Sequence, residues 1–278
     1  MLIGSILNNS ERWINISKTD FENLEKPDTM LKRNILSTYG NLNKVFMYLE
    51  LGILPVKFVI MEKRLNFLRY IIKESMCSMI RQVYELLKTE SVKGDFIDLI
   101  KKDMEELDID FTEEEIQNTT KIQWKKYIHE KVKIAGLEYL NEENSNKSKT
   151  KHINFETLNM SDYLVKNKNT SISKIIFSVR AGTLDLKAWN DWKYVDKLCV
   201  MCGEFEEDFE HFMSCTLYGH EIQENNWKDI FEDDSEKQYS IALEVKRRTN
   251  LRKSKLEAGL PHLLAPFLQD SVELTSNT

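Results

Sequence analysis

The sequence predicts a mainly α-helical protein, and two observations lead to this. Only 9 Gly and 4 Pro occur in 278 residues, so the chain has few of the turn residues that a many-stranded sandwich or barrel needs. Apolar residues also recur in several windows at the three- and four-residue spacing of an amphipathic helix. With 41% hydrophobic and 30% charged residues, the chain can bury one sizeable core or two modest ones.

The first predicted helices follow one another over residues 17–139. A helix begins at Ser17, where Asp20 completes a pattern that resembles a capping box, and Pro27 should kink or interrupt it. Four further windows each place apolar residues on one helical face. These residues are Met61, Leu65, Leu68 and Ile72; Met76, Ile80, Val83 and Leu87; Ile97, Ile100, Met104 and Leu107; and Trp124, Ile128, Val132, Ala135 and Tyr139.

A polar stretch then divides the chain. Residues 141–150 contain no apolar residue and no periodicity, as is typical of a linker. We therefore expect a boundary there between two helical parts. The expected organisation is a helical region over residues 1–140, a polar linker over 141–153, a second helical region over 154–257 and a frayed tail over 258–278.

Two helices are predicted in the second helical region. Apolar residues over 172–179 indicate a helix that begins near Ser171 or Ser173 and runs to Arg180. Residues 236–257 have the composition of a basic helix. The cysteine-rich segment of the chain lies between these two predicted helices.

The strongest local signal is the pattern Cys199-x2-Cys202-x8-His211-x3-Cys215. Zinc binds thiolate and imidazole ligands in a tetrahedron, and a two-residue gap lets two cysteines bind one ion from a single tight turn. Gly203 supports that turn because it can adopt a positive φ. His211 and Cys215 are four residues apart, so one helical turn would aim both side chains at one point. With four protein ligands the site should be structural, because a catalytic zinc keeps one position for water.

Two other interpretations of these residues stay open. The cysteines could be ordinary thiols beside a chance histidine, and His220 could replace His211 as the fourth ligand. The second alternative adds distance along the chain and loses the i, i+4 pairing. Cys77 lies apart from the cluster, beside Met76 and Met79, which fits a core thiol.

The distribution of cysteines also bears on the compartment. Three of the 4 Cys crowd into residues 199–215, unlike the spread, paired framework of secreted domains. The apolar run at residues 1–7 has no preceding basic residue and is cut off by polar residues, so we expect neither a signal peptide nor a membrane anchor. We therefore expect an intracellular protein of the cytoplasm, the nucleus or both.

The net charge of −6 argues against a protein that grips nucleic acid with its whole surface, because phosphate binding depends on Lys and Arg. The charges lie in blocks: residues 57–73 have five basic residues against one acid, residues 244–257 six against two, and residues 95–115 ten acids against two lysines. The favoured interpretation of any one block is a solvated helix face. The loop between the cysteine and histidine ligands is acidic, so it would repel phosphate.

Any contact with nucleic acid should therefore be local, from basic groups that pair with phosphates and aromatic groups on which bases stack. Trp192 and the neighbouring Trp189 and Tyr194 fit a protein core equally well. The candidates are Lys57, Lys63, Arg64, Arg69, Lys187, Trp192 and Lys193.

We expect no catalytic centre. Residues 231–234, Phe-Glu-Asp-Asp, superficially match the aromatic-x-Asp-Asp of polymerases. They lie in a polar stretch with no flanking strand hairpin to bring a third carboxylate alongside, so we set them aside. No Gly-rich phosphate loop, paired-acid glycosidase signature or Ser/His/Asp arrangement stands out.

Residues 48–72, YLELGILPVKFVIMEKRLNFLRYII, resemble the segment that follows the polymerase core in the reverse transcriptases of non-LTR (LINE-type) retrotransposons. In that family, YLELG-x-(L/I)P-(I/V)-(R/K) leads into a basic RRLNFL helix. The resemblance covers nearly the whole chain, in the order of the family. Further similar stretches are residues 9–13, 24–25, 31–36, 198–215 and 226–231, of which residues 198–215 resemble the family's C-terminal Cys-Cys-His-Cys motif.

The resemblance implies a helical thumb-like bundle followed by a helical region with a small Cys-Cys-His-Cys zinc knuckle. In such enzymes these parts help hold template RNA and target DNA during target-primed reverse transcription. The endonuclease and the catalytic palm would precede Met1, so the chain alone would be no enzyme. Pro27, where the family has a continuous helix, and the position of Met1 suggest a truncated or decaying copy.

The expected partners follow from the same resemblance. They are RNA or DNA, bound weakly by the chain alone, with the missing polymerase part as a further candidate; zinc is the expected cofactor. Neither a membrane nor a small-molecule substrate is expected. A second interpretation, favoured by the net charge of −6, is a structural or protein-interaction module domesticated from a retroelement or decaying from one. A third is a subunit that complements a separately encoded polymerase.

Overall fold

The computed structural model confirms the mainly helical fold. It describes residues 7, 9–12, 16–36, 43–90, 92–151, 153–190, 192–219, 226–232 and 234–259. Within these ranges the chain forms helices and one isolated antiparallel bridge, Leu198 with Glu206, and no sheet. The chain divides into two compact units, residues 1–160 and 161–278. None of the described helices is long and apolar enough to cross a lipid bilayer.

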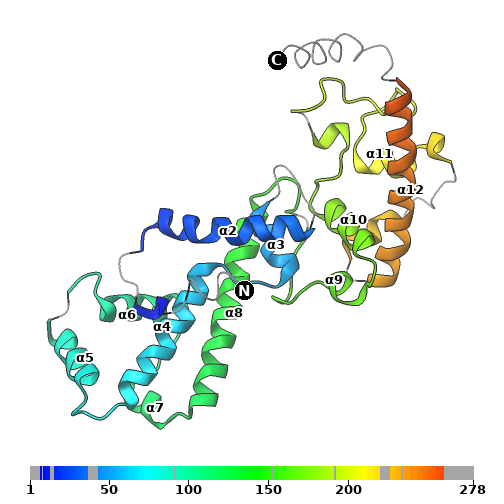
Figure 1. Ribbon diagram of the computed structural model, residues 1–278. Coiled ribbons are helices and arrows are strands. Elements are labelled where there is room, and N and C mark those ends of the chain that lie inside the picture. Colours follow the sequence, from blue (N-terminus) through cyan, green and yellow to red (C-terminus); the bar gives the residue numbers. More distant parts are fainter. Residues whose placement is uncertain are drawn as a thin grey trace, which may run out of the picture. The chain divides into compact units, whose positions relative to one another are not determined.

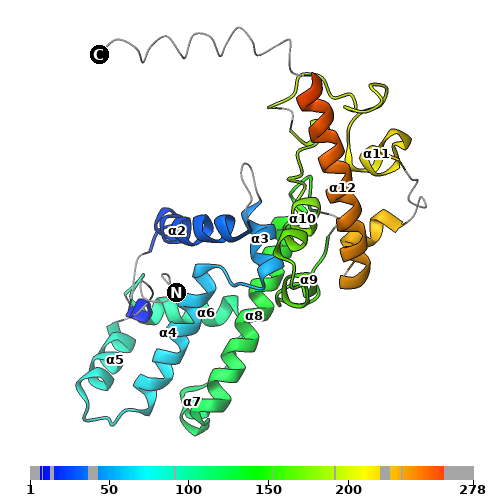
Figure 2. The same ribbon diagram turned by 45° about the vertical axis from the view of Figure 1, so that its right-hand side comes forward.

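The first unit is built around two long antiparallel helices, α4 (Val56–Lys73) and α8 (Lys121–Ser145), which lie side by side in Figures 1 and 2. At the start of α8, the indole N–H of Trp124 donates to the carbonyl of Leu65 in α4 at 3.3 Å. The other described helices of this unit are η1 (Ser10–Arg12), α2 (Lys18–Leu36), α3 (Lys44–Leu51), α5 (Met79–Glu90), α6 (Phe96–Glu106) and α7 (Glu113–Asn118).

The core of the first unit lies where α4, α6 and α8 meet. Leu65 of α4, Ile100 of α6, and Ile128 and Val132 of α8 are buried in one cluster. Three of the four predicted apolar windows supply buried residues to this core, and the window of α5 packs Ile80 and Leu87 against it. Tyr139, at the end of the last window, is 42% exposed. Each fully buried aliphatic side chain contributes roughly 1.5–3 kcal/mol relative to an exposed one.

α2 begins with the predicted capping box. The Ser17 N–H donates to Asp20 Oδ2 at 2.9 Å, and the Asp20 N–H donates to Ser17 Oγ at 3.2 Å. Pro27 does not interrupt the helix, which continues from Lys18 to Leu36. A proline inside a helix removes one backbone hydrogen bond and crowds the carbonyl four residues earlier, but tertiary contacts hold α2 in place: the buried Glu25 accepts a backbone N–H from the start of α4 at 3.1 Å.

α5 buries only half of the predicted apolar face. Ile80 and Leu87 pack against the core, whereas Val83 is 49% exposed, and Met76 precedes the helix and is 63% exposed. Arg81 and Tyr84 are buried as well. Both side chains donate to Glu113 at the start of α7, at 3.0 Å each. Polar contacts therefore help to set the orientation of this helix, and the apolar pattern alone could not show them.

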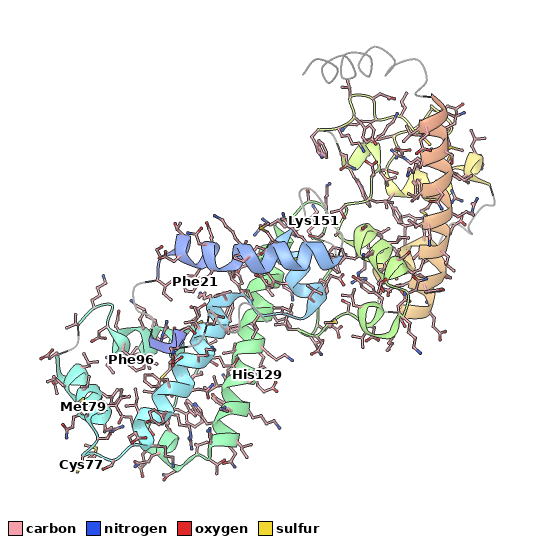
Figure 3. The ribbon with its side chains drawn as sticks, in the orientation of Figure 1. Phe21, Cys77, Met79, Phe96, His129 and Lys151 are labelled. Carbon is pink, nitrogen blue, oxygen red and sulfur yellow. The ribbon has the colours of Figure 1, made fainter. Side chains whose placement is uncertain are left out.

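Cys77 is exposed, so the prediction of a core thiol is wrong. It lies in the turn before α5, and Figure 3 shows it near Met79, which is 81% exposed. Because Arg81 and Tyr84 take the buried side of α5, the residues that lead into the helix face solvent.

The predicted linker over 141–153 is part of the first unit. α8 continues to Ser145, and the described residues beyond it fold back on the buried Asn144. The amide of Asn144 donates to the carbonyls of Thr150 at 2.9 Å and Ile153 at 3.1 Å, and its oxygen accepts from the Thr150 hydroxyl at 2.6 Å. Hydrogen bonds of side-chain amides thus hold this polar stretch in a packed structure. The boundary between the two units lies after Met160.

Gly52 shows how closely this last segment packs. It ends α3 with a φ of +61° and donates to the carbonyls of Leu49 and Tyr48. A Cβ atom on Gly52 would lie 2.4 Å from the carbonyl carbon of Asn159 and the backbone nitrogen of Met160. Glycine is therefore required here both by its left-handed conformation and by the approach of the backbone.

The second unit contains both predicted helices, α10 (Thr170–Arg180) and α12 (Ser235–Gly259). α10 begins at an Asn169 cap, one or more residues before the predicted start. Buried apolar residues of α10 and α12, among them Ile176 and Val245, supply the core. Residues 260–278 of the predicted tail lie outside the described residues. The remaining described helices are α9 (Asp162–Lys166), η2 (Lys187–Trp189), α11 (Phe209–Ser214), η3 (Thr216–Tyr218) and η4 (Asn226–Phe231).

Candidate metal centre

The four predicted metal ligands converge on one point. The ligand atoms of Cys199, Cys202, His211 and Cys215 all lie within 4.8 Å of one another. The Sγ atoms of Cys199 and Cys215 are 4.0 Å apart, and Cys202 Sγ is 3.3 Å from His211 Nε2. A tetrahedral zinc ion would place two sulfurs roughly 3.8 Å apart and a sulfur and a nitrogen roughly 3.5 Å apart. The donors are thus spaced for a single tetrahedral ion.

A tight turn presents the first two cysteines. The Cys199 N–H donates to the carbonyl of Phe205 at 2.7 Å, and the Gly203 N–H donates to the carbonyl of Cys199 at 2.9 Å. Gly203 has a φ of +72°, in agreement with the predicted need for a positive φ. The turn brings Cys202 back toward the same side as Cys199.

The other two ligands come from the short helix α11. Its cap, Asp208, accepts the backbone N–H of His211 at 2.7 Å. The Cys215 N–H donates to the carbonyl of His211 at 2.7 Å, so the predicted helical turn joins the two ligands. Side chains four residues apart in a helical turn project to the same side.

The environments of the thiols differ. Burial raises the pKa of Cys199 to about 12. Burial also raises the pKa of Cys202, but hydrogen bonds from the Glu204 and Phe205 backbone and from His211 outweigh it and lower that pKa to about 6. A buried, protonated Cys199 gains a strong partner only when a cation replaces its proton. The donor set and its burial therefore fit a structural zinc ion better than a hard cation such as Mg²⁺, which prefers oxygen ligands.

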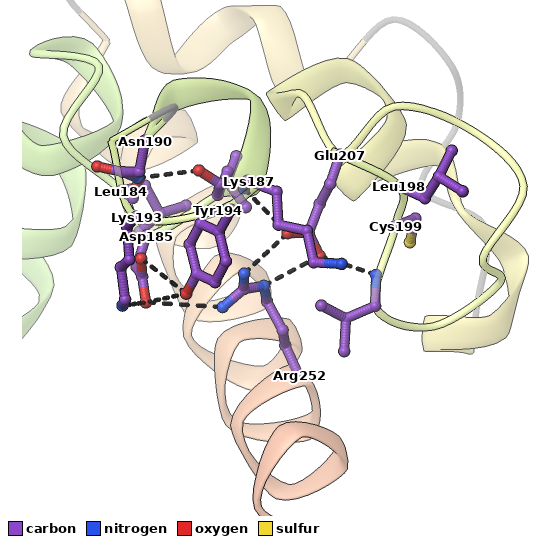
Figure 4. A network of polar contacts seen from close by, with 12 residues as sticks. Leu184, Asp185, Lys187, Asn190, Lys193, Tyr194, Leu198, Cys199, Glu207 and Arg252 are labelled. Carbon is purple, nitrogen blue, oxygen red and sulfur yellow. Dashed lines mark hydrogen bonds and ion pairs between the residues drawn. The ribbon is translucent and has the colours of Figure 1, made fainter. Parts of the chain in front are cut away.

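The loop between the ligands is fixed by a buried carboxylate, shown in Figure 4. Glu207 is 0% exposed. It accepts the backbone N–H groups of Lys187 at 3.1 Å and Val200 at 3.2 Å. It also accepts from Arg252 of α12, at 3.0 Å from Nε and 2.8 Å from Nη2. The sequence predicts that the acids of this loop make it a poor phosphate-binding site. The structure adds that one of them, Glu207, joins three segments of the second unit.

A second arginine of α12 supports the helix that carries His211 and Cys215. Arg248 Nη1 donates to the carbonyls of Phe212 at 3.0 Å and Cys215 at 3.2 Å, and its guanidinium lies 5.4 Å from the centre of the Tyr218 ring. Sequence reasoning missed this role. A signal was present, since Ile241, Val245, Arg248 and Arg252 recur at four- and three-residue spacing and so continue one buried helical face.

The nucleic-acid candidates of the first unit have partners within the chain. Lys57 pairs with Glu106, Lys63 donates to the carbonyl of Leu7 at 2.6 Å, and Arg69 donates to the carbonyl of Thr119 at 2.7 Å. Arg64 is buried and pairs with Asp103 at 2.6 Å. The assignment of Arg64 to phosphate binding is therefore wrong, because its charge is needed to compensate a buried carboxylate. The other three do not form a free cationic surface.

The nucleic-acid candidates of the second unit differ in their partners and in their exposure. Lys187 pairs with Asp196 at 2.7 Å and Lys193 with Asp185 at 2.8 Å. Trp192 is 75% exposed, whereas Trp189 stacks on Phe209 with ring centres 5.7 Å apart. Of the predicted group, Trp192 alone presents its ring fully to solvent.

Two further predictions concern residues near gaps in the described chain. Asp234 of the Phe-Glu-Asp-Asp stretch caps α12 by accepting the backbone N–H groups of Glu236 at 3.1 Å and Lys237 at 3.2 Å. Asp233 and the alternative ligand His220 lie outside the described residues. Among the residues that the structure describes, the cysteine-histidine cluster is the only group of three or more His, Cys, Asp or Glu side chains placed to share a metal ion.

The fold and the site together define a mainly α-helical protein with a Cys-Cys-His-Cys centre that could hold a metal ion. Comparisons with protein-family models, with curated proteins and with solved structures found no match.

Proposed function

We propose that this chain is a zinc-binding, nucleic-acid-binding C-terminal region of a non-LTR retrotransposon reverse transcriptase, with a thumb-like helical unit and a zinc knuckle. The observation that carries the proposal is the convergence of Cys199, Cys202, His211 and Cys215 within 4.8 Å. The YLELG-to-RLNFL stretch at residues 48–72, which forms α3 and α4, precedes this site in the same order as in that family.

The zinc ion would have a structural role. Three thiolates and one imidazole complete a tetrahedron, which leaves no position for a reacting water. Residues Cys199, Cys202, His211 and Cys215 would hold the ion, and the ion would fix the hairpin that Glu207 and Arg252 attach to α12. The proposed zinc site would therefore stabilise the fold of the second unit.

We further propose that the chain has no polymerase activity alone. Polymerases place carboxylates around two metal ions about 4 Å apart. In the part of the chain that the structure describes, no set of three or more carboxylates is placed to share a metal ion. A polymerase centre would have to come from another polypeptide segment.

The test uses the purified full-length chain. Elemental analysis should find about one zinc per chain, and labelled RNA or DNA should bind with an affinity that falls steeply between low and physiological salt. Nucleotide incorporation on a primed RNA template should be absent. Metal-free protein, or incorporation by the chain alone, would contradict the corresponding part of the proposal.

A second candidate function is a protein-interaction module. Met79, Val83 and Leu86 are 81%, 49% and 56% exposed and lie at four- and three-residue spacing along α5, so an apolar stripe faces solvent. The pairing of Lys57 and Arg64 with acids of the same chain also favours this candidate. Absence of any RNA or DNA binding at low salt would support it over the first.

A further inference from the structure

The first half of α8 carries three lysines whose charges are not used within the described part of the chain. Lys121, Lys125 and Lys126 are exposed, and none of their side chains forms a hydrogen bond or ion pair with another described residue. We call these three residues the lysine face of α8. It differs in this respect from the basic block over 57–73, where Lys57, Arg64 and Arg69 all have partners.

The start of α8 offers the lysine face no counter-charge. The first turn of α8, which the structure describes in full, contains no acidic residue. Glutamates 113–115 instead occupy the first turn of α7, where the helix dipole favours them. Lys121 lies in the first turn of α8, where the same dipole disfavours a cation. The charge of Lys121 therefore does not stabilise the helix that carries it, which points to an external anion.

The arrangement of the lysines suits a linear anion. Lys121 and Lys125 are four residues apart and project to the same side of the helix, about 6 Å apart along its axis. His129, labelled in Figure 3, continues this side by another four residues, where it faces Glu62 at 3.2 Å. Glu62 thus ends the positive row at the third turn. Lysines on flexible stems bind phosphates as point charges without a fixed geometry.

We infer that the lysine face binds the phosphodiester backbone of RNA or DNA, an inference that rests on the proposed function. The contact would position a strand without reading its bases, since phosphate contacts carry no sequence information directly. The side chain beside the lysines is Ile122, which is 81% exposed and has no group to read a base edge. A flat anionic membrane fits less well, because it would also meet the exposed Glu114 and Glu115 of the preceding helix, whereas a single strand can lie along the lysines alone.

The test compares two triple variants of the full-length chain. Lys121→Gln, Lys125→Gln and Lys126→Gln together remove the lysine face. Lys101→Gln, Lys147→Gln and Lys151→Gln change the net charge equally at exposed lysines of the same unit that also lack a described partner. Glutamine has a helix propensity close to that of lysine, and equal circular dichroism would confirm that both variants fold.

Binding to labelled single-stranded RNA, single-stranded DNA and an RNA–DNA hybrid would be measured over a salt series. The slope of log K against log salt should fall in magnitude by about 2 for single strands when the three lysines are removed, and by nearly 3 for a duplex. The control variant should keep the slope of the natural chain.

The outcomes separate the two proposals. If the natural chain binds and the lysine-face variant keeps its slope, this inference is wrong and the proposed function stands. If the natural chain binds none of the three probes at low salt, the proposed function is wrong and the inference with it. If the lysine-face variant loses the binding of the natural chain to phosphatidylserine vesicles but keeps its binding to nucleic acid, the inference is also wrong.

Discussion

Arg252 Nη2 of α12 lies 2.8 Å from Glu207 Oε2 in the loop between the metal ligands, and both side chains are buried, at 4% and 0% exposed (Figure 4). A buried ion pair stabilises a fold only when its remaining polar atoms are also satisfied. Here the backbone N–H groups of Lys187 and Val200 donate to the Glu207 carboxylate and satisfy its remaining acceptor positions. The pair thus connects the metal centre to the longest helix of the second unit.

Removing one member of this pair should destabilise the second unit strongly. We expect Arg252→Met to lower the free energy of unfolding by about 3–5 kcal/mol, because it leaves the Glu207 carboxylate buried and uncompensated. The double variant Glu207→Leu, Arg252→Met should cost less than the sum of the two single changes. Urea unfolding measures all three. Lys255→Met, at an exposed position of α12, is the control and should cost little. Strictly additive costs would show that the pair is not coupled.

The metal centre should control the folding of its surroundings. We expect about one zinc per chain, and Cys202→Ser should lose it, because a serine hydroxyl is a poor zinc ligand at neutral pH. Hydrogen exchange should then rise over residues 196–219 more than in the helices of the first unit. Cys77→Ser is a matched control, since Cys77 is exposed and distant in sequence from the cluster. Unchanged exchange over 196–219 after loss of metal would contradict a structural role.

The convergence of the four candidate ligands was predictable because they form a local pattern. Cys199 and Cys202 share one turn, and His211 and Cys215 share another, so spacing alone indicates convergence. Most helices were predictable for the same reason, since apolar periodicity and capping residues act over a few positions. The local rule that Pro27 should interrupt α2 fails, because contacts with other parts of the first unit hold the helix.

Roles that depend on distant partners were not predictable. Glu207 and Arg252 are 45 residues apart, and in the sequence both look like solvated charges. Arg64 has the same ambiguity, since only the fold shows that it meets Asp103. The polar residues after α8 look like a linker because hydrogen bonds such as those of Asn144 leave no trace in hydropathy. Charge and polarity in a sequence therefore do not reveal burial.

The contacts of Glu113 predict a pH dependence in the first unit. Burial raises the pKa of Glu113, but hydrogen bonds from Lys88, Tyr84 and Arg81 outweigh it and lower that pKa below its ordinary value of 4.5. A group with a lowered pKa in the folded state stabilises the protein above its unfolded pKa and loses this effect as pH falls through the folded value. The contribution should be present at pH 7 and be lost as pH falls below 4.5 and through the lower pKa of the folded state.

Glu113→Gln tests this directly. At pH 7 the substitution should cost about 1 kcal/mol in the free energy of unfolding, a modest value because solvent screens a partly exposed carboxylate. The difference between the natural chain and the variant should shrink as pH is lowered from 6 to 3. Glu114→Gln, at the neighbouring exposed position, should show no such trend. A difference that is constant with pH would mean that Glu113 does not act through its charge.

Two glycines with left-handed backbone should respond differently to alanine. Gly52 has a φ of +61° and no room for a Cβ, which would lie 2.4 Å from the backbone of Asn159. Gly203 has a φ of +72° and no atom within 4 Å of the position of a Cβ. Gly203→Ala should therefore cost only the conformational term, about 1–2 kcal/mol, whereas Gly52→Ala should cost at least about 3 kcal/mol because the backbone must also move. Urea unfolding of the zinc-loaded chain gives both values. Equal costs would show that the backbone of residues 159–160 does not pack against Gly52 as the structure has it.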